Sequence, residues 1–154
     1  MSRAFVKESD EQAREELPEL QVSPHRNFVT PAGLRQIESA VERLRETLAR
    51  ARAADDRSAV LRIQRDLRYW VERLRTAEVV IPPAANGLVR FGSTVVLDKS
   101  NGSRISYQLV GEDEADPSQG KISYVSPIAR KMLGASIGGR VTLPDGDAEV
   151  AEIR

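Results

Sequence analysis

Cysteine is absent from this chain of 154 residues. A chain without thiols forms neither a disulfide framework nor a thiolate metal site, and this composition fits the reducing interior of a cell. Long apolar runs are absent as well: none approaches the roughly 18 apolar residues that cross a membrane, and the first residues lack the apolar core of a signal peptide. We therefore expect a cytoplasmic protein that does not enter a membrane.

Net charge is also missing, because 23 basic residues balance 23 acidic ones. Such a chain has no overall electrostatic footprint for non-specific binding to nucleic acid, so any contact with DNA or RNA must be local. Residues 30–86 are mildly basic, with 11 basic against 8 acidic residues. The only histidine, His25, lies in an unpatterned segment and is assigned no catalytic or metal role. The sequence contains no nucleophile constellation, phosphate loop or dinucleotide motif.

Residues 1–29 mix charges with two prolines and follow no sustained period. This composition is typical of an extended or partly disordered N-terminal arm. Two short apolar spots in it, Phe5–Val6 and Phe28–Val29, offer contacts to the folded body.

Residues 30–80 carry the pattern of an antiparallel coiled-coil hairpin. Thr30 is a suitable helix N-cap, and Pro31 suits the first helical position. Apolar residues then recur at alternating spacings of three and four, which is the seam of a coiled coil. The first seam is Leu34, Ile37, Val41, Leu44, Leu48 and Ala51, and the second is Val60, Ile63, Leu67, Trp70, Leu74 and Ala77. The short connection at Ala54–Arg57 forces the two helices, each about 35 Å long, to run antiparallel.

The period changes to two beyond the proline-rich stretch at Ile81–Gly87, so residues 87–154 are expected to form a separate domain. Serine, proline and glycine bracket one short helix over 126–134. The predicted strands are Val89–Phe91, Thr94–Leu97, Ile105–Val110, Ile122–Val125, Val141–Leu143 and Ala148–Ile153. The fold class is therefore α+β: a helical hairpin followed by an antiparallel β-sheet packed on one helix.

Three strings in the second half carry a family resemblance: "GLVRFGSTVVL", "SYQLVGEDEADPSQGKISYVSPIARKMLG" and "GGRVTLPDGDAEVAEI". They resemble the C-terminal domain of the bacterial GreA/GreB transcript-cleavage factors, and the order of hairpin and β domain is also that of the family. The resemblance implies an FKBP-like domain at 87–154 that docks on the rim of the secondary channel of bacterial RNA polymerase. It assigns the docking contact to five residues: Ser126, Pro127, Ile128, Ala129 and Arg130.

The resemblance further implies that an accessory factor, rather than an enzyme, sends its hairpin tip towards the polymerase active centre and the 3′ end of the nascent RNA. We expect this factor to be a monomer. In that family an aspartate and a glutamate three residues later help to hold a second Mg²⁺ and the attacking water, and the polymerase then cleaves its own backtracked RNA. The matching catalytic and metal-binding candidates here are Asp55 and Asp56. The chain alone would bind no cofactor, because the Mg²⁺ is shared with the polymerase.

Two departures from the family pattern keep a second function open. The position three after Asp56 is Ala59, which has no carboxylate, and the hairpin is roughly three turns, or about 15 Å, shorter than the familiar one. A non-cleaving regulator that occupies the same channel is therefore the alternative. A proline isomerase, suggested only by the FKBP-like topology, is disfavoured because the aromatics of 87–154 are few: Phe91, Tyr107 and Tyr124.

Several signals also have a purely structural explanation. An aspartate before a helix, as at Asp55 and Asp56, caps its free N–H groups. The ten arginines from Arg43 to Arg75 are expected to be mostly solvated flanks of the coiled coil, paired with nearby acids, although a basic face for RNA or acidic channel walls is the alternative. Trp70 lies on the seam and is expected in the core. The acidic string Glu112–Asp116 is interpreted as a solvated loop.

Overall fold

The computed structural model describes residues 17–82, 84 and 86–154 and divides the chain into two compact units. The hairpin unit contains Ile37–Thr76 and the segment up to Pro24, whereas the sheet unit combines His25–Gln36 with Ala77–Arg154. The first 16 residues of the predicted arm lie outside the described residues. None of the described helices is long and apolar enough to cross a membrane.

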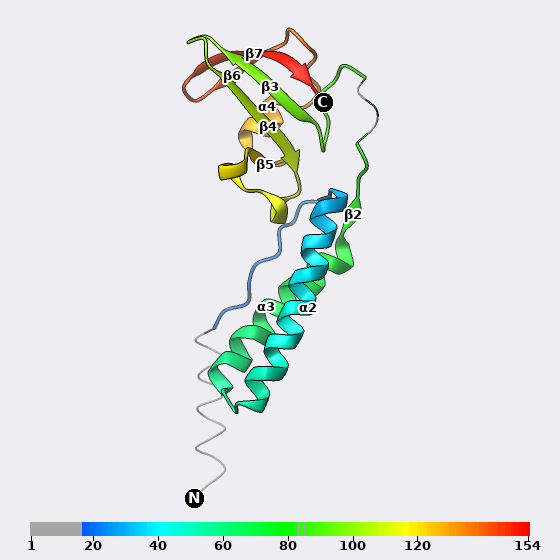
Figure 1. Ribbon diagram of the computed structural model, residues 1–154, viewed down its shortest axis with the longest axis vertical. Helices are drawn as coiled ribbons and strands as arrows, with labels where there is room; N and C mark the ends of the chain where they lie inside the picture. Colours follow the sequence, from blue (N-terminus) through cyan, green and yellow to red (C-terminus); the bar gives the residue numbers. More distant parts are fainter. Residues whose placement is uncertain (1–16, 83, 85) are drawn as a thin grey trace, which may run out of the picture. The chain divides into compact units, whose positions relative to one another are not determined.

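Two helices, α2 (Pro31–Ala53) and α3 (Arg57–Thr76), form the predicted hairpin and lie side by side in Figure 1. The start of α2 confirms the predicted cap, because the Thr30 hydroxyl accepts a hydrogen bond from the Gly33 N–H at 2.9 Å. Side chains from both seams pack together towards the tip. Leu48, Ala51 and Ile63 are buried there, and Leu44, Ala59, Val60 and Leu67 pack around them.

The sheet unit is built on a five-stranded sheet with strand order β5-β4-β3-β7-β6. The predicted α+β order of elements is confirmed, with one difference: β5 pairs parallel with β4, so the sheet is mixed rather than purely antiparallel. The parallel pair arises because two 3₁₀ turns, Glu112–Glu114 and Pro117–Gln119, carry the chain back before β5 begins. The strands are β3 (Thr94–Lys99), β4 (Arg104–Val110), β5 (Lys121–Ser123), β6 (Arg140–Leu143) and β7 (Gly146–Ile153).

One helix, α4 (Pro127–Met132), packs its buried residues Ala129 and Met132 into the core of the sheet unit. The Ser126 cap and Pro127 at the first turn confirm the predicted start of this helix. The buried core of the unit comprises Val89, Val95, Leu97, Leu109, Ile122, Ala129, Met132, Val141, Leu143, Ala148 and Val150.

The predicted strand at Val89–Phe91 is wrong. Val89 is buried and exchanges backbone hydrogen bonds with the segment after α4, but Gly92, with φ +85°, turns the chain before a ladder can form. Only an isolated bridge joins Leu88 to Ser136. Two very short strands that the sequence pattern did not indicate, β1 (Phe28–Val29) and β2 (Glu78–Val79), pair in parallel at the two ends of the hairpin sequence. The apolar spot at Phe28–Val29 is thus part of the sheet unit.

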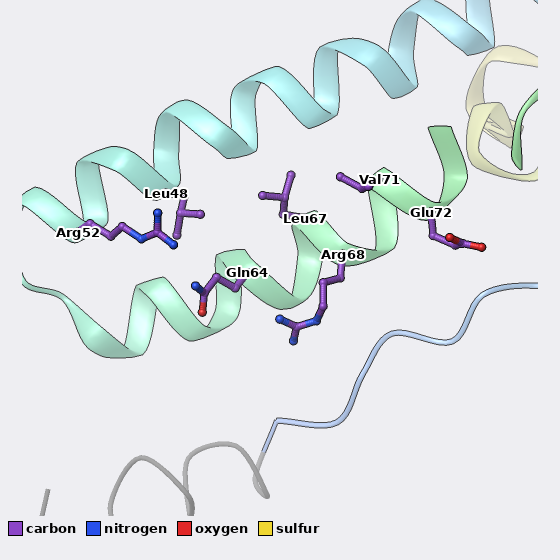
Figure 2. A pocket seen from close by; sticks show the side chains of 7 residues that line it. All are labelled: Leu48, Arg52, Gln64, Leu67, Arg68, Val71 and Glu72. Atoms are coloured by element: carbon purple, nitrogen blue, oxygen red, sulfur yellow. The ribbon is translucent and has the colours of Figure 1, made fainter. Parts of the chain in front are cut away.

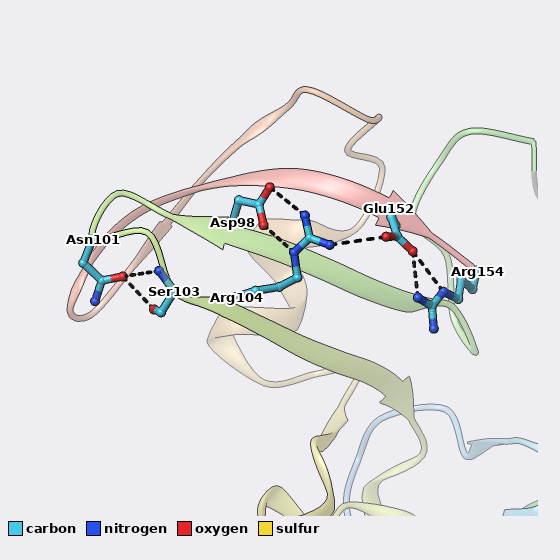
Figure 3. A network of polar contacts seen from close by, with 6 residues as sticks. All are labelled: Asp98, Asn101, Ser103, Arg104, Glu152 and Arg154. Atoms are coloured by element: carbon cyan, nitrogen blue, oxygen red, sulfur yellow. Dashed lines mark hydrogen bonds and ion pairs between the residues drawn. The ribbon is translucent and has the colours of Figure 1, made fainter.

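A ladder of charged side chains crosses three strands of the sheet (Figure 3). Arg104 on β4 binds both carboxylate oxygens of Asp98 on β3, at 2.7 and 3.1 Å, and approaches Glu152 on β7 at 3.5 Å. Arg154 contacts the other oxygen of Glu152. These exposed pairs fix the register of the strands more than they stabilise the unit, since solvent screens them.

Candidate functional site

The hairpin tip is a three-residue connection, Ala54–Asp56, between α2 and α3. The Asp55 N–H donates to the Arg52 carbonyl at 3.1 Å, and the Asp56 N–H donates to the Ala51 carbonyl at 3.0 Å. This pair of bonds is a Schellman motif, which requires a left-handed residue after the helix. Asp55 occupies that position with φ +52°, where glycine is the usual residue.

The two aspartates of the tip have different local roles. The Asp56 carboxylate accepts a hydrogen bond from the Ala59 N–H at 3.0 Å and so caps α3. The side chain of Asp55 is exposed and takes no part in this cap. The structural explanation for Asp56 is therefore confirmed, and Asp55 is the carboxylate with more freedom to bind a partner group.

Ala59 lies where the resemblance would place a second acid. Its side chain is half-buried and packs against the cluster of Leu48, Ala51 and Ile63 between the helices. A longer acidic side chain at position 59 would have to extend past these apolar side chains to place its carboxylate in solvent. The tip thus presents two adjacent carboxylates, Asp55 and Asp56, instead of an acid pair spaced by three residues.

Carboxylate oxygens are the hard ligands that Mg²⁺ prefers, and this ion is commonly held by one or two carboxylates together with substrate phosphates and water. The chemistry of Asp55 and Asp56 fits such a shared ion. Within the described parts of the chain, no group of three or more His, Asp or Glu side chains could hold a metal alone. Any ion at the tip would need further ligands from another molecule.

The predicted docking loop contains side chains with unequal exposure. Ser126 caps α4 by accepting the Ala129 N–H at 3.3 Å, Ala129 is fully buried, and Ile128 packs against the core. Only Pro127 and Arg130 of the five predicted residues are exposed. These two side chains form the part of the loop that a partner can contact, while the other three hold its shape.

A strap formed by Arg26–Phe28, which belongs to the sheet unit, packs against two other aromatic residues of that unit. The ring of Phe28 lies 6.0 Å from that of Phe91 and 5.4 Å from that of Tyr124, and the Tyr124 hydroxyl donates to the Arg26 carbonyl. The Arg26 guanidinium stacks over Phe28 at 4.9 Å. Two of the three aromatics that a proline-binding pocket could use, Phe91 and Tyr124, are therefore packed against the chain itself.

Glu114 is a structural residue that sequence reasoning missed. It is buried, and its carboxylate accepts a hydrogen bond of 2.5 Å from the Thr30 hydroxyl at the start of α2. Gly33 leaves room for this carboxylate, since a Cβ at that position would lie 2.6 Å from Glu114 Oε2. The expectation of a solvated loop at 112–116 is wrong at this residue. The segment 112–116 contains several acidic residues, and their spacing alone does not show which of the side chains is buried.

Three of the ten arginines between Arg43 and Arg75 form the expected pairs with acids of their own helix. Arg50, Arg65 and Arg75 contact Glu46, Asp66 and Glu72. The hydrogen bond from Arg75 lowers the pKa of the Glu72 carboxyl below its usual value. Arg73 differs, since it is buried rather than solvated. Trp70 is half-buried and packs edge to face on Tyr69, with ring centroids 5.2 Å apart.

Comparison with known proteins shows which family this sequence is similar to. A family model described as the C-terminal region of the transcription elongation factors GreA and GreB matches residues 84–154. The GreA of Alkalilimnicola ehrlichii is 45% identical over 89 residues, which cover 53% of this chain and 56% of that protein. The GreB of Neisseria meningitidis serogroup B is 33% identical over 147 residues, which cover 81% of this chain and 90% of that protein.

Among solved structures, the GreA homologue Gfh1 of Thermus thermophilus aligns with a TM-score of 0.41 at 23% identity, covering 84% of this chain and 99% of that one. The GreA/GreB factor of Nitrosomonas europaea aligns with a TM-score of 0.38 at 22% identity, covering 82% and 98% of the two chains.

These sequence matches are all to proteins of one class, the transcription elongation factors. The chain aligns with about half the length of its GreA relatives, from 43% to 56%, and with most of the length of GreB. It belongs to the GreA/GreB family. The expectation of an accessory factor rather than an enzyme agrees with that membership.

Proposed function

We propose that this protein acts in the cytoplasm as a monomer that binds bacterial RNA polymerase at its secondary channel and stimulates cleavage of backtracked RNA. The sheet unit would dock on the channel rim, and the hairpin would enter towards the active centre and the 3′ end of the RNA. The observation that carries this proposal is the tip, where a two-helix hairpin ends in two exposed carboxylates, Asp55 and Asp56.

The hairpin suits insertion into a channel because it is narrow and stiff. Two helices of 23 and 20 residues extend about 30–35 Å and share one apolar seam. Its flanks carry paired charges, which remain compatible with water and with polar channel walls.

Docking would use the exposed side chains of the α4 loop, Pro127 and Arg130. An arginine at a protein interface commonly contributes more binding energy than its neighbours. Its planar guanidinium group can donate two parallel hydrogen bonds to one carboxylate. Arg130→Ala should therefore weaken polymerase binding at least about tenfold. Arg140→Ala, which removes an exposed arginine from β6, is the matched control.

Asp55 and Asp56 would supply two ligands to a Mg²⁺ ion shared with the polymerase, and such an ion activates water for attack on the RNA phosphate. The chain itself contributes the positions of these carboxylates. The Schellman turn projects Asp55 from the tip, and the cap bond holds Asp56 at the first turn of α3.

Asparagine substitutions test this role without disturbing the fold. Asparagine caps a helix about as well as aspartate and tolerates the left-handed conformation, so Asp55→Asn and Asp56→Asn remove charge and little else. In a purified backtracked complex, each variant should bind the polymerase normally but shorten the RNA about tenfold more slowly, or slower still. Equal RNA shortening by wild type and double variant would refute the metal role.

The non-cleaving alternative predicts a different pattern in the same assay. The half-buried Ala59 favours it, since the tip lacks the spaced second acid of the family. The wild-type protein would then bind the polymerase and compete with other channel-binding factors, with no RNA shortening above the level of polymerase alone. Ala59→Glu separates the two cases further: an increase in RNA shortening in that variant would mean that the tip reaches the active centre and lacks only the ligand.

Proline isomerisation is the weakest of the three functions. Phe28 of the strap packs on Phe91 and Tyr124, and these are the rings that would have to receive a proline. An isomerisation assay on a short proline peptide should give no rate above the uncatalysed one.

A further inference from the structure

The groove on the hairpin, shown in Figure 2, carries charges of both signs. Arg52, Arg68 and Glu72 line it, and Arg68 already binds both carboxylate oxygens of Glu19. Such a groove selects no single class of charged ligand. A more specific chemistry is found on the surface of the sheet unit, where an exposed asparagine twice precedes a glycine.

An asparagine followed by glycine can rearrange without an enzyme. The backbone nitrogen of the glycine attacks the side-chain carbon Cγ, so that an N–C bond forms while the Cγ–Nδ2 bond breaks. The amide proton leaves with the side-chain nitrogen as ammonia, and a five-membered cyclic imide remains. One water then opens either carbonyl of the imide, which gives an aspartate or an isoaspartate whose main chain runs through Cβ. Glycine favours the attack, since no Cβ crowds the attacking nitrogen.

The pair Asn101-Gly102 lies in the turn between β3 and β4, and hydrogen bonds hold it there. The Gly102 N–H donates to the Lys99 carbonyl at 3.0 Å, and the Lys99 N–H donates to the Ser103 carbonyl at 2.8 Å. The Ser103 N–H and hydroxyl also bind Asn101 Oδ1, at 2.9 and 2.6 Å, as Figure 3 shows. The attacking nitrogen is therefore engaged, and the turn must open before this nitrogen can reach Cγ.

The pair Asn86-Gly87 lies in the exposed stretch between β2 and Val89. Among the described residues, the Gly87 N–H has no hydrogen-bond acceptor. A Cβ built on Gly87 would have no neighbour within 4 Å, so nothing obstructs the movement of this peptide. The Leu88 N–H donates to Asn86 Oδ1 at 3.3 Å and so stabilises the oxygen that becomes negative during the attack. This site combines an unengaged nucleophile with a polarised amide.

Two further positions with related chemistry are protected. The remaining asparagine of the chain, Asn27, is buried and precedes Phe28, whose side chain crowds the attacking nitrogen. Asp145 precedes Gly146, but its carboxylate pairs with Lys99 Nζ at 2.6 Å, and this hydrogen bond lowers the pKa of the Asp145 carboxyl. An ionised carboxylate resists attack by nitrogen, so this turn stays unmodified at neutral pH.

We propose that Asn86-Gly87 is a site of spontaneous modification, at which Asn86 is converted to isoaspartate and aspartate while the turn at Asn101-Gly102 preserves its asparagine. Each event consumes one water and releases one ammonia, without oxidation or reduction. The product has a new negative charge at position 86, and the isoaspartate adds one methylene to the main chain. This inference goes beyond the proposed function and does not depend on it.

The modification should leave the core of the sheet unit intact. Val89, three residues further on, donates to the Ala135 carbonyl and accepts from the Gly134 N–H, at 2.8 Å each. These bonds hold the chain where it enters the core, so the longer main chain is accommodated in the exposed stretch before them.

The full-length folded protein can be tested in water labelled with a heavy oxygen isotope. Each opening of the imide incorporates the label, and peptide mass spectrometry locates it. We expect label at Asn86 at least about tenfold faster than at Asn101, because two backbone hydrogen bonds hold the second turn. Asn86→Gln should abolish the fast site, since glutamine would have to form a six-membered ring. Asn101→Gln is the matched control and should leave the rate at Asn86 unchanged.

The denatured chain supplies the reference. Without its turns, the two asparagine–glycine pairs should react at similar rates, so the ratio of the rates should fall to about one. A ratio that stays near its folded value in denaturant would overturn the structural explanation, because neighbouring residues would then set the difference. Equal rates in the folded protein, or faster labelling at Asn101, would overturn the proposal. So would a folded protein that acquires no label at Asn86 while the denatured chain does.

Discussion

The two units of this protein differ in how much apolar surface each one buries. Among the described residues, the sheet unit contains a core cluster of eleven buried apolar residues, while six apolar residues of the hairpin unit are buried, three of them in the cluster near the tip. A unit with eleven buried side chains can stabilise itself, whereas a single thin seam adds little beyond helix formation. The comparison teaches that the sheet unit has the larger share of the stabilising apolar burial, and that the hairpin unit is the less stable of the two.

The largest expected effect is in the core of the sheet unit. Leu109 is fully buried in the sheet unit, so Leu109→Ala should lower the free energy of unfolding by about 3–5 kcal/mol. Denaturant unfolding measures the loss. Arg140→Ala, on the surface of the same sheet, should change stability little. A loss below about 1 kcal/mol at Leu109 would mean that the sheet core does not dominate stability.

The next effect tests the packing of β1 within the sheet unit. Gly111 has an ordinary φ of −67°, yet a Cβ at this position would lie 2.4 Å from the Phe28 carbonyl oxygen. Gly111→Ala should therefore displace β1 and cost about 1–3 kcal/mol by overpacking. The fluorescence or NMR signals of Phe28 and Tyr124 should change with it. Gly102→Asn, at an exposed turn with no neighbour, serves as the control.

The third prediction concerns the thin seam itself. Ile63 is 9% exposed and has only a small cluster around it, so Ile63→Ala should cost about 1–2 kcal/mol, less than a substitution in the sheet core. Hydrogen exchange should accelerate in α2 and α3 and stay unchanged in β3 and β4. Equal acceleration in both units would show that they unfold as one, against the comparison above.

A stabilising change is expected at the tip. Asp55 adopts a left-handed conformation with φ +52°, so Asp55→Gly should raise the stability of the hairpin by about 0.5–1 kcal/mol. If the carboxylate acts in RNA cleavage, the same variant loses activity while it gains stability. Thermal unfolding and the RNA-shortening assay, run on one preparation, would separate the two effects.

The smallest effect is electrostatic. The hydrogen bond from Arg104 lowers the pKa of the Asp98 carboxyl. A lowered native pKa contributes stability above the unfolded pKa of about 3.9, and that contribution disappears as the pH falls through the native pKa. In Arg104→Gln the pKa of Asp98 should return towards its usual value. The free energy of unfolding should then lose the part of its pH dependence that comes from Asp98. An NMR titration of the carboxyl carbon measures the change.

Local sequence signals predicted those elements whose cause is local. Thr30-Pro31 and Ser126-Pro127 marked two helix starts correctly, because caps depend on neighbours in sequence. The parallel pairing of β5 and the burial of Glu114 depend on distant partners, which no short pattern encodes. The tip aspartates were assigned from the resemblance to the GreA/GreB family, which directed attention to the connection between the two seams. That Asp56 forms the cap and Asp55 the left-handed residue required the backbone geometry.

The parallel bridge between β1 and β2 has a consequence for the order of folding. Joining Phe28 to Glu78 in an unfolded chain closes a loop of about 50 residues, at an entropic cost of about 3.5 kcal/mol. Once α2 and α3 have formed through contacts local to the turn, the two ends already lie near each other and most of that cost has been met. The helices should therefore form early and the bridge late, which lets hairpins of other lengths be exchanged on the same base without slowing its assembly.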